Sequence, residues 1–232
     1  LFRSVALHKI LFTFTKIGNF WLIRRSPSLA RTIGRDEKLF AGRPVWPCFC
    51  SFPREAEAGR SNTTVKRIGL LSDTHGTFDA PLRKFLAEVD EIWHAGDFGN
   101  IETADAIAAF KPLRGVYGNI DGGALRVVYP QWQQFDCEQV PVLITHIGGY
   151  PGHYQSGVET RLRALRPKIF ISGHSHILKV IYDKKLDLLH LNPGAAGLSG
   201  FHQVRTALRF TVDGERIEEL EVGEWKRNMG LY

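Results

Sequence analysis

Five short apolar segments, each ending abruptly in polar residues, constrain the fold of this 232-residue chain more than any other feature. They read RIGLLSD, EIWHAGD, LRGVYGN, VPVLITH and KIFISGH, and helical patterns such as IETADAIAAF separate several of them. Strands that are apolar on both faces are typical of buried, largely parallel sheets with helices packed on them. The alternation therefore predicts an α/β fold.

The pattern changes after residue 176. Four more strand-like segments follow, separated by turn residues such as Asp213-Gly214, and they read ILKVIYD, LDLLHLN, VRTALRFTVD and RIEELEV. Such turns between neighbouring strands predict antiparallel hairpins, which we expect to complete a second sheet. The predicted architecture is a four-layer sandwich of two mixed β-sheets flanked by helices.

The first 64 residues differ in character from the rest of the chain. Through residue 66 there are 12 Lys and Arg against 4 Asp and Glu, and the remainder has 18 against 20, so the net charge of +6 comes from this segment. The folded part therefore lacks the basic excess of a nucleic-acid-binding domain, and we expect no nucleic-acid partner. Lys16 interrupts the apolar run, whereas a membrane span needs about 20 largely apolar residues, so we expect no membrane association.

We expect residues 1–64 to be an N-terminal extension outside the fold, included by a misplaced start, and residues 65–232 to form the domain. The chain does not begin with Met, its one Met is Met229, and VKRIGLLSDTHG from Val65 resembles a natural protein start. An organelle transit peptide is the alternative, because the first acidic residue is Asp36. The intact mass or the N-terminal sequence of the native protein would decide between them.

The three cysteines, Cys48, Cys50 and Cys137, do not form a disulfide framework. Their number is odd, and two of them lie in the doubtful N-terminal segment. Disulfide-poor chains are typical of reducing compartments, so we expect a cytoplasmic protein with Cys137 as a small core residue.

Seven metal-capable side chains follow the five apolar segments: Asp73, His75, Asp97, Asn119, His146, His174 and His176. Ligand sites gather at the carboxyl ends of strands in such sheets. Residues two apart on an extended backbone point to the same side, so Asp73 with His75, and His174 with His176, are each predicted to form a pincer. Mixed oxygen and imidazole donors suit Mn, Fe, Zn or Ni better than Ca or Mg. Two metals about 3.5–4 Å apart need a bridging ligand, which we assign to Asp97.

The order D-x-H, G-D, G-N, H and G-H-x-H resembles that of the calcineurin-like metallophosphoesterases, in particular the small bacterial phosphodiesterases of that family. The resemblance covers residues 67–232. It implies one metal held by Asp73, His75, Asp97 and His176, and a second held by Asp97, Asn119, His146 and His174. It also implies two divalent metal ions, Mn first and Fe, Zn or Ni as alternatives, that act on a small phosphoester. The implied reaction is in-line attack of a hydroxide bridging both metals, so Asp97, Asn119 and His146 take part in catalysis through the metals.

One position departs from that pattern. Many relatives carry a histidine directly after the metal-binding Asn, where this chain has Ile120. Without this proton donor, monoesters with poor leaving groups are disfavoured and a phosphodiesterase is favoured. We predict that His153, on a glycine-rich loop after His146, contacts the substrate instead. Weaker candidates for phosphate contact are Arg126 and Tyr150. We assign His94 a supporting or packing role and assign no functional role to His8, His190 and His202.

Two other functions remain open. A retromer subunit of the same fold serves as a protein-interaction platform, so a non-catalytic scaffold is the alternative to an enzyme. The intact ligand set favours the enzyme. Nucleic-acid binding through the basic N-terminal segment is the third hypothesis, and its test is salt-dependent binding that requires residues 1–64. Small relatives are often dimers or tetramers, so a homo-oligomer is expected.

Overall fold

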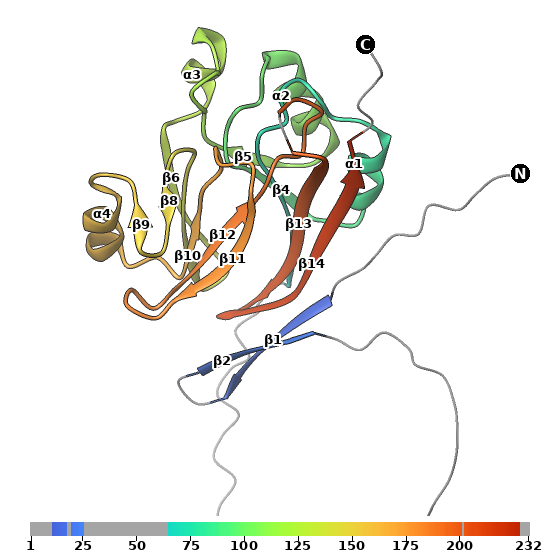
Figure 1. Cartoon of the computed structure of the whole chain (residues 1–232). Coiled ribbons are helices and arrows are strands. Elements are labelled where there is room, and N and C mark those ends of the chain that lie inside the picture. Colours follow the sequence, from blue (N-terminus) through green and yellow to red (C-terminus); the bar gives the residue numbers. More distant parts are fainter. Residues whose placement is uncertain (1–10, 18–19, 26–64, 201, 228–232) are drawn as a thin grey trace, which may run out of the picture.

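Two mixed sheets packed face to face make up the domain (Figure 1). This computed structural model describes residues 11–17, 20–25, 65–200 and 202–227. The larger sheet has seven strands in the order β2-β1-β14-β13-β3-β4-β5. Their bounds are β1 Leu11–Ile17, β2 Phe20–Arg25, β3 Lys66–Leu71, β4 Glu91–His94, β5 Leu113–Gly115, β13 Val204–Asp213 and β14 Arg216–Lys226. Strands β3, β4 and β5 run parallel, and β13 is antiparallel to both β3 and β14.

The smaller sheet has five strands in the order β11-β12-β10-β7-β6. Their bounds are β6 Trp132–Cys137, β7 Val140–Thr145, β10 Ile169–Ile171, β11 Leu178–Asp183 and β12 Leu188–Pro193. Its three central strands are parallel, and the edge strands β6 and β11 are antiparallel to their neighbours. Two short strands, β8 Gly149–Tyr150 and β9 His153–Tyr154, form a separate hairpin after β7.

Helices form the outer layers. Their bounds are α1 Ala80–Phe85, α2 Ile101–Phe110, α3 Gly123–Val128 and α4 Val158–Leu165. Helices α1 and α2 pack on the outer face of the larger sheet, and α4 packs on the outer face of the smaller one, so α1 and α4 lie on opposite sides of the molecule in Figure 1. Helix α1 begins where the Asp79 carboxylate accepts from the backbone N–H of Leu82 and Pro81 occupies the first turn. The predicted four-layer architecture is confirmed.

The core between the sheets explains why the strands are apolar throughout. Ile68 and Leu70 of β3 and Ile169 of β10 are fully buried between the sheets. Leu71 and Phe170, each one residue further along, point the other way and are buried under the helices. Successive strand side chains alternate between faces, so a strand covered on both sides has no polar position.

The structure corrects part of the predicted topology. The four C-terminal strands do form antiparallel hairpins, but they do not complete one sheet together. The β11–β12 hairpin extends the smaller sheet, whereas β13–β14 joins the larger one beside β3. Helix α1 ends at Phe85, and Leu86 and Val89, which follow it, are also buried. Helix α3 and strands β6, β8 and β9 were not predicted, because each has at most six residues and no sustained period.

Part of the N-terminal segment forms strands. No element is predicted before Val65, yet β1 and β2 form an antiparallel pair, drawn in blue in Figure 1. The pair extends the larger sheet where Leu11 and Phe12 are partners of Glu221 and Leu220 in β14. The rest of residues 1–64, with both of its cysteines, lies outside the described residues. A native start at Val65 stays a prediction. Among the described helices, none combines the length and apolar character that crossing a membrane requires.

Candidate metal centre

The structure brings all seven predicted ligands together beyond the carboxyl ends of β3, β4, β5, β7 and β10. Six of them form two groups in which the potential ligand atoms lie within 4.8 Å of one another: Asp73, His75 and His176, and Asp97, His146 and His174. Asn119 belongs to the second group, since its Oδ1 lies 3.0 Å from Nε2 of His146. Both groups have the donor chemistry to hold a metal ion.

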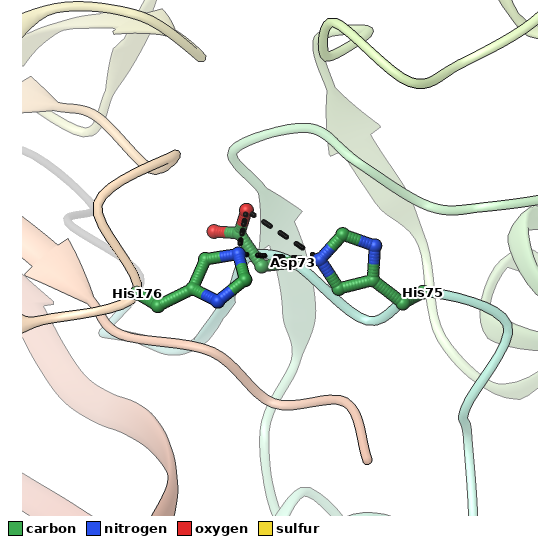
Figure 2. A group of neighbouring side chains, drawn as sticks. All are labelled: Asp73, His75 and His176. Carbon is green, nitrogen blue, oxygen red and sulfur yellow. Dashed lines mark hydrogen bonds and ion pairs between the residues drawn. The ribbon is translucent and has the colours of Figure 1, made fainter. Parts of the chain in front are cut away.

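The first group surrounds a buried carboxylate oxygen (Figure 2). Asp73 is fully buried, and its Oδ2 accepts from Oγ of Ser72 at 2.5 Å and from the backbone N–H of His174 at 3.2 Å. Its Oδ1 accepts no hydrogen bond and faces Nε2 of His176 at 3.2 Å and Nε2 of His75 at 4.0 Å. The two ring nitrogens are 3.2 Å apart. A buried carboxylate oxygen that accepts no hydrogen bond is costly unless a cation lies beside it in place of the donor. This group therefore fits a divalent ion.

The second group also directs acceptor atoms at one point. Nδ1 of His146 lies 2.7 Å from the carbonyl oxygen of Ala95, and because a carbonyl only accepts, this nitrogen carries the ring proton. In the neutral ring the Nε2 lone pair then faces Asn119 Oδ1 at 3.0 Å and Asp97 Oδ2 at 3.2 Å. Burial opposes protonation of His146, but the carboxylates of Asp97 and Asp73 and the Ala95 carbonyl together outweigh it and raise the pKa of the ring. Three acceptors converging in this way need a cation, which a divalent metal would supply.

The backbone at the ligands is left-handed. Positive φ angles occur at five of the seven: Asp73 (53°), His75 (46°), Asp97 (59°), His174 (66°) and His176 (57°). The extended backbone assumed for the two predicted pincers is therefore wrong. His174 and His176 also belong to different groups. Non-glycine residues adopt such angles rarely, and strained backbone of this kind clusters at functional sites.

Asp121 is a site residue that the sequence analysis missed. It is 2% exposed. Its Oδ2 accepts from the backbone N–H groups of Asp97 at 3.0 Å and Gly118 at 2.7 Å, and its Oδ1 accepts from that of Gly99 at 3.0 Å. The carboxylate therefore ties the loop that carries Asp97 to the loop that carries Asn119. In the sequence it is two residues beyond Asn119, where it is indistinguishable from an ordinary turn residue.

His94 supports the same loops from beneath. Nδ1 of His94 accepts from the backbone N–H of Gly96 at 3.1 Å, so Nε2 carries the proton and donates to Oγ1 of Thr74 at 3.0 Å. The Thr74 hydroxyl in turn donates to the carbonyl of Phe98 at 3.2 Å. Complete burial lowers the pKa of His94 to about 3, so the ring stays neutral and this chain of hydrogen bonds persists at neutral pH. This is the supporting role expected for His94.

Two further histidines lie in the segments that follow β7 and β12. His153 is exposed on the β8–β9 hairpin and packs against the ring of Tyr150 at 4.9 Å between centroids. His202, to which the sequence analysis assigned no role, lies 6.0 Å from the ring of His176. The position of the His202 ring depends on the loop that follows β12, and no sequence pattern predicts the conformation of that loop.

Arg126 is engaged with the protein itself. Its Nε donates to the carbonyl of Asp121 at 2.8 Å, and a terminal nitrogen donates to the carbonyl of Asn119 at 3.3 Å. The guanidinium also lies over the ring of Tyr117 at 4.8 Å. These contacts make it a brace for the ligand loop rather than a free phosphate-binding cation.

Solved structures share this fold. Vacuolar protein sorting 29 from Cryptosporidium parvum is 16% identical, with a TM-score of 0.57 over 70% of this chain and 98% of its own. A Streptococcus pneumoniae protein described as a predicted phosphoesterase is 21% identical, with a TM-score of 0.51 over 73% and 94%. Zinc-complexed Vps29 from Entamoeba histolytica is 18% identical, with a TM-score of 0.53 over 71% and 94%. At these identities the likeness shows the fold.

Family membership rests on a match of the sequence itself. No curated protein matches the chain significantly. The family model for the calcineurin-like phosphoesterase superfamily domain matches residues 67–215, which is more than half of the chain and includes all seven predicted ligands. The chain therefore belongs to the calcineurin-like phosphoesterase superfamily.

Proposed function

We propose that this protein is a metal-dependent phosphodiesterase. The observation that carries the proposal is the pair of adjacent ligand groups, in which Asp73 Oδ1 has no hydrogen-bond donor and His146 Nε2 faces two oxygens. Both arrangements are unfavourable without cations and favourable with them. Two divalent metals held side by side are suited to phosphoester hydrolysis.

The ligand assignment that we propose follows the two groups. Asp73, His75 and His176 hold one metal, and Asn119, His146 and His174 hold the other. Oδ1 of Asp97 accepts from the backbone N–H of Ile120 at 3.1 Å, so Oδ2 would be the oxygen through which Asp97 contributes to the metal site. Mn is the metal we expect, with Fe, Zn or Ni as alternatives of similar ligand preference. When bound, the two ions supply Lewis acidity at the phosphoryl oxygens and lower the pKa of a water molecule.

The chain itself orients these groups. The Nδ1 proton of His146, donated to the Ala95 carbonyl, fixes the ring so that Nε2 points into the site. The backbone N–H of His174 and the hydroxyl of Ser72 hold one oxygen of Asp73, so the other oxygen faces the site. Gly118 allows this close packing, because a β-carbon there would overlap the Asp97 carboxylate. These contacts fix the orientation of the ligands, which favours rapid catalysis by limiting reorganisation.

The residue after Asn119 supports diesters over monoesters. Ile120 stands where a proton-donating histidine stands in many relatives, and its side chain is half exposed. Hydrolysis of a monoester with a poor leaving group gains most from a proton donor, whereas the acidic leaving group of an activated diester departs without protonation. We therefore propose small phosphodiesters as substrates.

The proposal is tested with bis-p-nitrophenyl phosphate. Purified protein loaded with Mn²⁺ is expected to release p-nitrophenolate, and removal of metal by a chelator is expected to abolish release, with recovery when Mn²⁺ returns. A parallel assay with p-nitrophenyl phosphate is expected to give the lower kcat/KM. Metal-loaded protein that hydrolyses no phosphodiester would contradict the proposal.

His153 is the substrate contact that we propose. His153→Ala is expected to lower kcat/KM for bis-p-nitrophenyl phosphate by about tenfold, the effect of one lost hydrogen bond to a charged group. The effect of His153→Ala is compared with that of His202→Ala in the same assay, because the ring of His202 lies beside that of His176. Unchanged diester turnover in His153→Ala would remove His153 from the site.

A non-catalytic scaffold is the alternative function. It has support in the fold shared with Vps29, one structure of which, from Chaetomium thermophilum, is a complex with a cyclic peptide. Metal binding alone does not separate the two functions, whereas turnover of a diester does. We further propose a cytoplasmic location, and a homo-oligomer stays a prediction that light scattering would test.

A further inference from the structure

Three exposed aliphatic side chains belong to residues that directly follow predicted ligands in the chain. Among the described residues, Ile120 is 50% exposed, Ile147 39% and Ile177 47%. Each directly follows a predicted ligand: Asn119, His146 or His176. Isolated exposed aliphatic residues are ordinary, but these three share a position next to a ligand, and we call them the apolar rim.

A fourth residue extends this rim. Leu198 is 48% exposed, and its backbone N–H lies 3.4 Å from the hydroxyl of Thr77, in the loop that follows the first pair of ligands. The neighbouring Gly197 donates its backbone N–H to the carbonyl of Asp73 at 3.0 Å. This contact fixes the loop that carries Leu198 against the ligand loop.

The backbone of the rim residues lies close to the ligands. Consecutive Cα atoms are about 3.8 Å apart, so Ile120, Ile147 and Ile177 each lie within one residue of a predicted ligand. The backbone N–H of Ile120 also donates to Oδ1 of Asp97 at 3.1 Å, which places this residue directly beside the site.

The arginines near the site are already engaged with the protein. Arg205 is 3% exposed, and its two terminal nitrogens donate to the carboxylate of Asp79 at 2.7 and 3.0 Å. Arg227 is 7% exposed and donates to the carbonyls of Gly197 and Gly200. As described above, Arg126 braces the loop of the metal-ligating Asn. A polyphosphate or a phosphorylated sugar acid would need free cations for its additional charges, and these arginines do not provide them.

We propose that the site takes phosphodiesters in which the phosphate carries an apolar or aromatic substituent. This inference rests on the proposed phosphodiesterase function and adds the substrate class to it. Bound metals would offset the single negative charge of the diester, and the apolar rim of Ile120, Ile147, Ile177 and Leu198 would contact the substituent. Removing this apolar surface from water supplies binding energy that a methyl ester cannot supply to the same extent.

The test compares phenyl p-nitrophenyl phosphate with methyl p-nitrophenyl phosphate. Both carry one charge and release the same leaving group, so the ratio of their kcat/KM values, corrected for their uncatalysed rates, reports contact with the substituent. We expect the phenyl ester to be favoured about tenfold, which corresponds to burial of roughly 60 Å² of apolar surface. The ratio is expected to fall toward one in Ile120→Ser, in Ile177→Ser and furthest in the double variant.

Val65→Ser is the matched control, because Val65 is 53% exposed but precedes β3 at the end opposite the ligands. It should keep the wild-type ratio. Equal turnover of the two esters by the wild type, or a ratio that the rim variants leave unchanged, would overturn the proposed substrate class while leaving the phosphodiesterase function intact.

A binding measurement separates failure of this inference from failure of the function. If Mn²⁺-loaded protein hydrolyses neither ester, the proposed function fails. Calorimetry then still measures the affinities for diphenyl phosphate and dimethyl phosphate, and their difference reports contact with the apolar rim. Tighter binding of diphenyl phosphate that is lost in the double variant would support the apolar rim. Equal affinity for the two diesters would overturn it.

Discussion

Asp97→Asn is expected to lower kcat for bis-p-nitrophenyl phosphate by about 10³-fold, which is the rate equivalent of several kcal/mol of metal-dependent charge stabilisation. Asp97 is 2% exposed, and its Oδ2 lies 3.2 Å from Nε2 of His146. An amide has the same shape as the carboxylate but brings no negative charge to offset two divalent ions. The variant should therefore fold and yet hold its metals weakly.

Two measurements check this expectation. Steady-state kinetics give kcat, and elemental analysis of dialysed protein gives the metal content, which should fall together with the rate. His174→Ala, which removes one predicted ligand of the second group, should likewise lower both kcat and the metal content. Asp136→Asn, an exposed change on β6, is the control and should leave both quantities unchanged. Full metal content with full activity in Asp97→Asn would contradict the proposed ligand role.

Asp121→Ala is the second change with a large expected effect. It would leave the backbone N–H groups of Asp97, Gly118 and Gly99 without their acceptor. Unsatisfied buried donors cost about 1–3 kcal/mol each, and partial access of water reduces the total, so we expect a loss of about 3 kcal/mol in the free energy of unfolding. For a domain of this size that corresponds to a Tm lower by roughly 6–12 °C. Loosening the two ligand loops should also reduce metal affinity by about 10–100-fold.

Asp121→Asn separates positioning of the ligands from general stability. The amide keeps one acceptor oxygen but turns two donors toward the backbone N–H groups that the other oxygen served. We expect an intermediate Tm and an intermediate metal affinity, measured by thermal denaturation and by titration with Mn²⁺. Asp136→Ala is the surface control. Wild-type metal affinity in Asp121→Ala, whatever its Tm, would show that this carboxylate does not position the ligands.

Much of the fold could be predicted because burial on both faces leaves a direct signature in the sequence. Strands such as β3 and β10 are apolar at every position that is covered, and their polar residues begin where the sheet ends. The same signature led to the seven predicted ligands, since each follows such a strand. The assignment of β13 and β14 to the larger sheet has no such signature. Both hairpins have similar composition, and only the packing of the whole domain decides which sheet each one joins.

The local geometry of the site was less predictable for a different reason. The left-handed backbone of Asp73 and His174 is imposed by tertiary hydrogen bonds, such as the one from the backbone N–H of Asp73 to the carbonyl of Gly96 at 2.9 Å. No propensity of Asp or His would place them there. Asp121 was missed for the same reason, because its three donors come from two separate loops. Contacts between loops decide these features, and a single sequence contains no record of them.

The position of β13 beside β3 has a consequence for biosynthesis. Leu70 of β3, near the start of the domain, is paired with Leu208 of β13, near its end. A nascent chain that has already produced every ligand, through His176, still lacks the neighbour that β3 requires on one side. Pairing between such distant segments is slow and exposes unpaired strand edges until it is complete. We therefore expect folding of the domain to finish only after β13 has been synthesised, and premature termination before β13 to yield an aggregation-prone product that contains all seven predicted ligands but no assembled site.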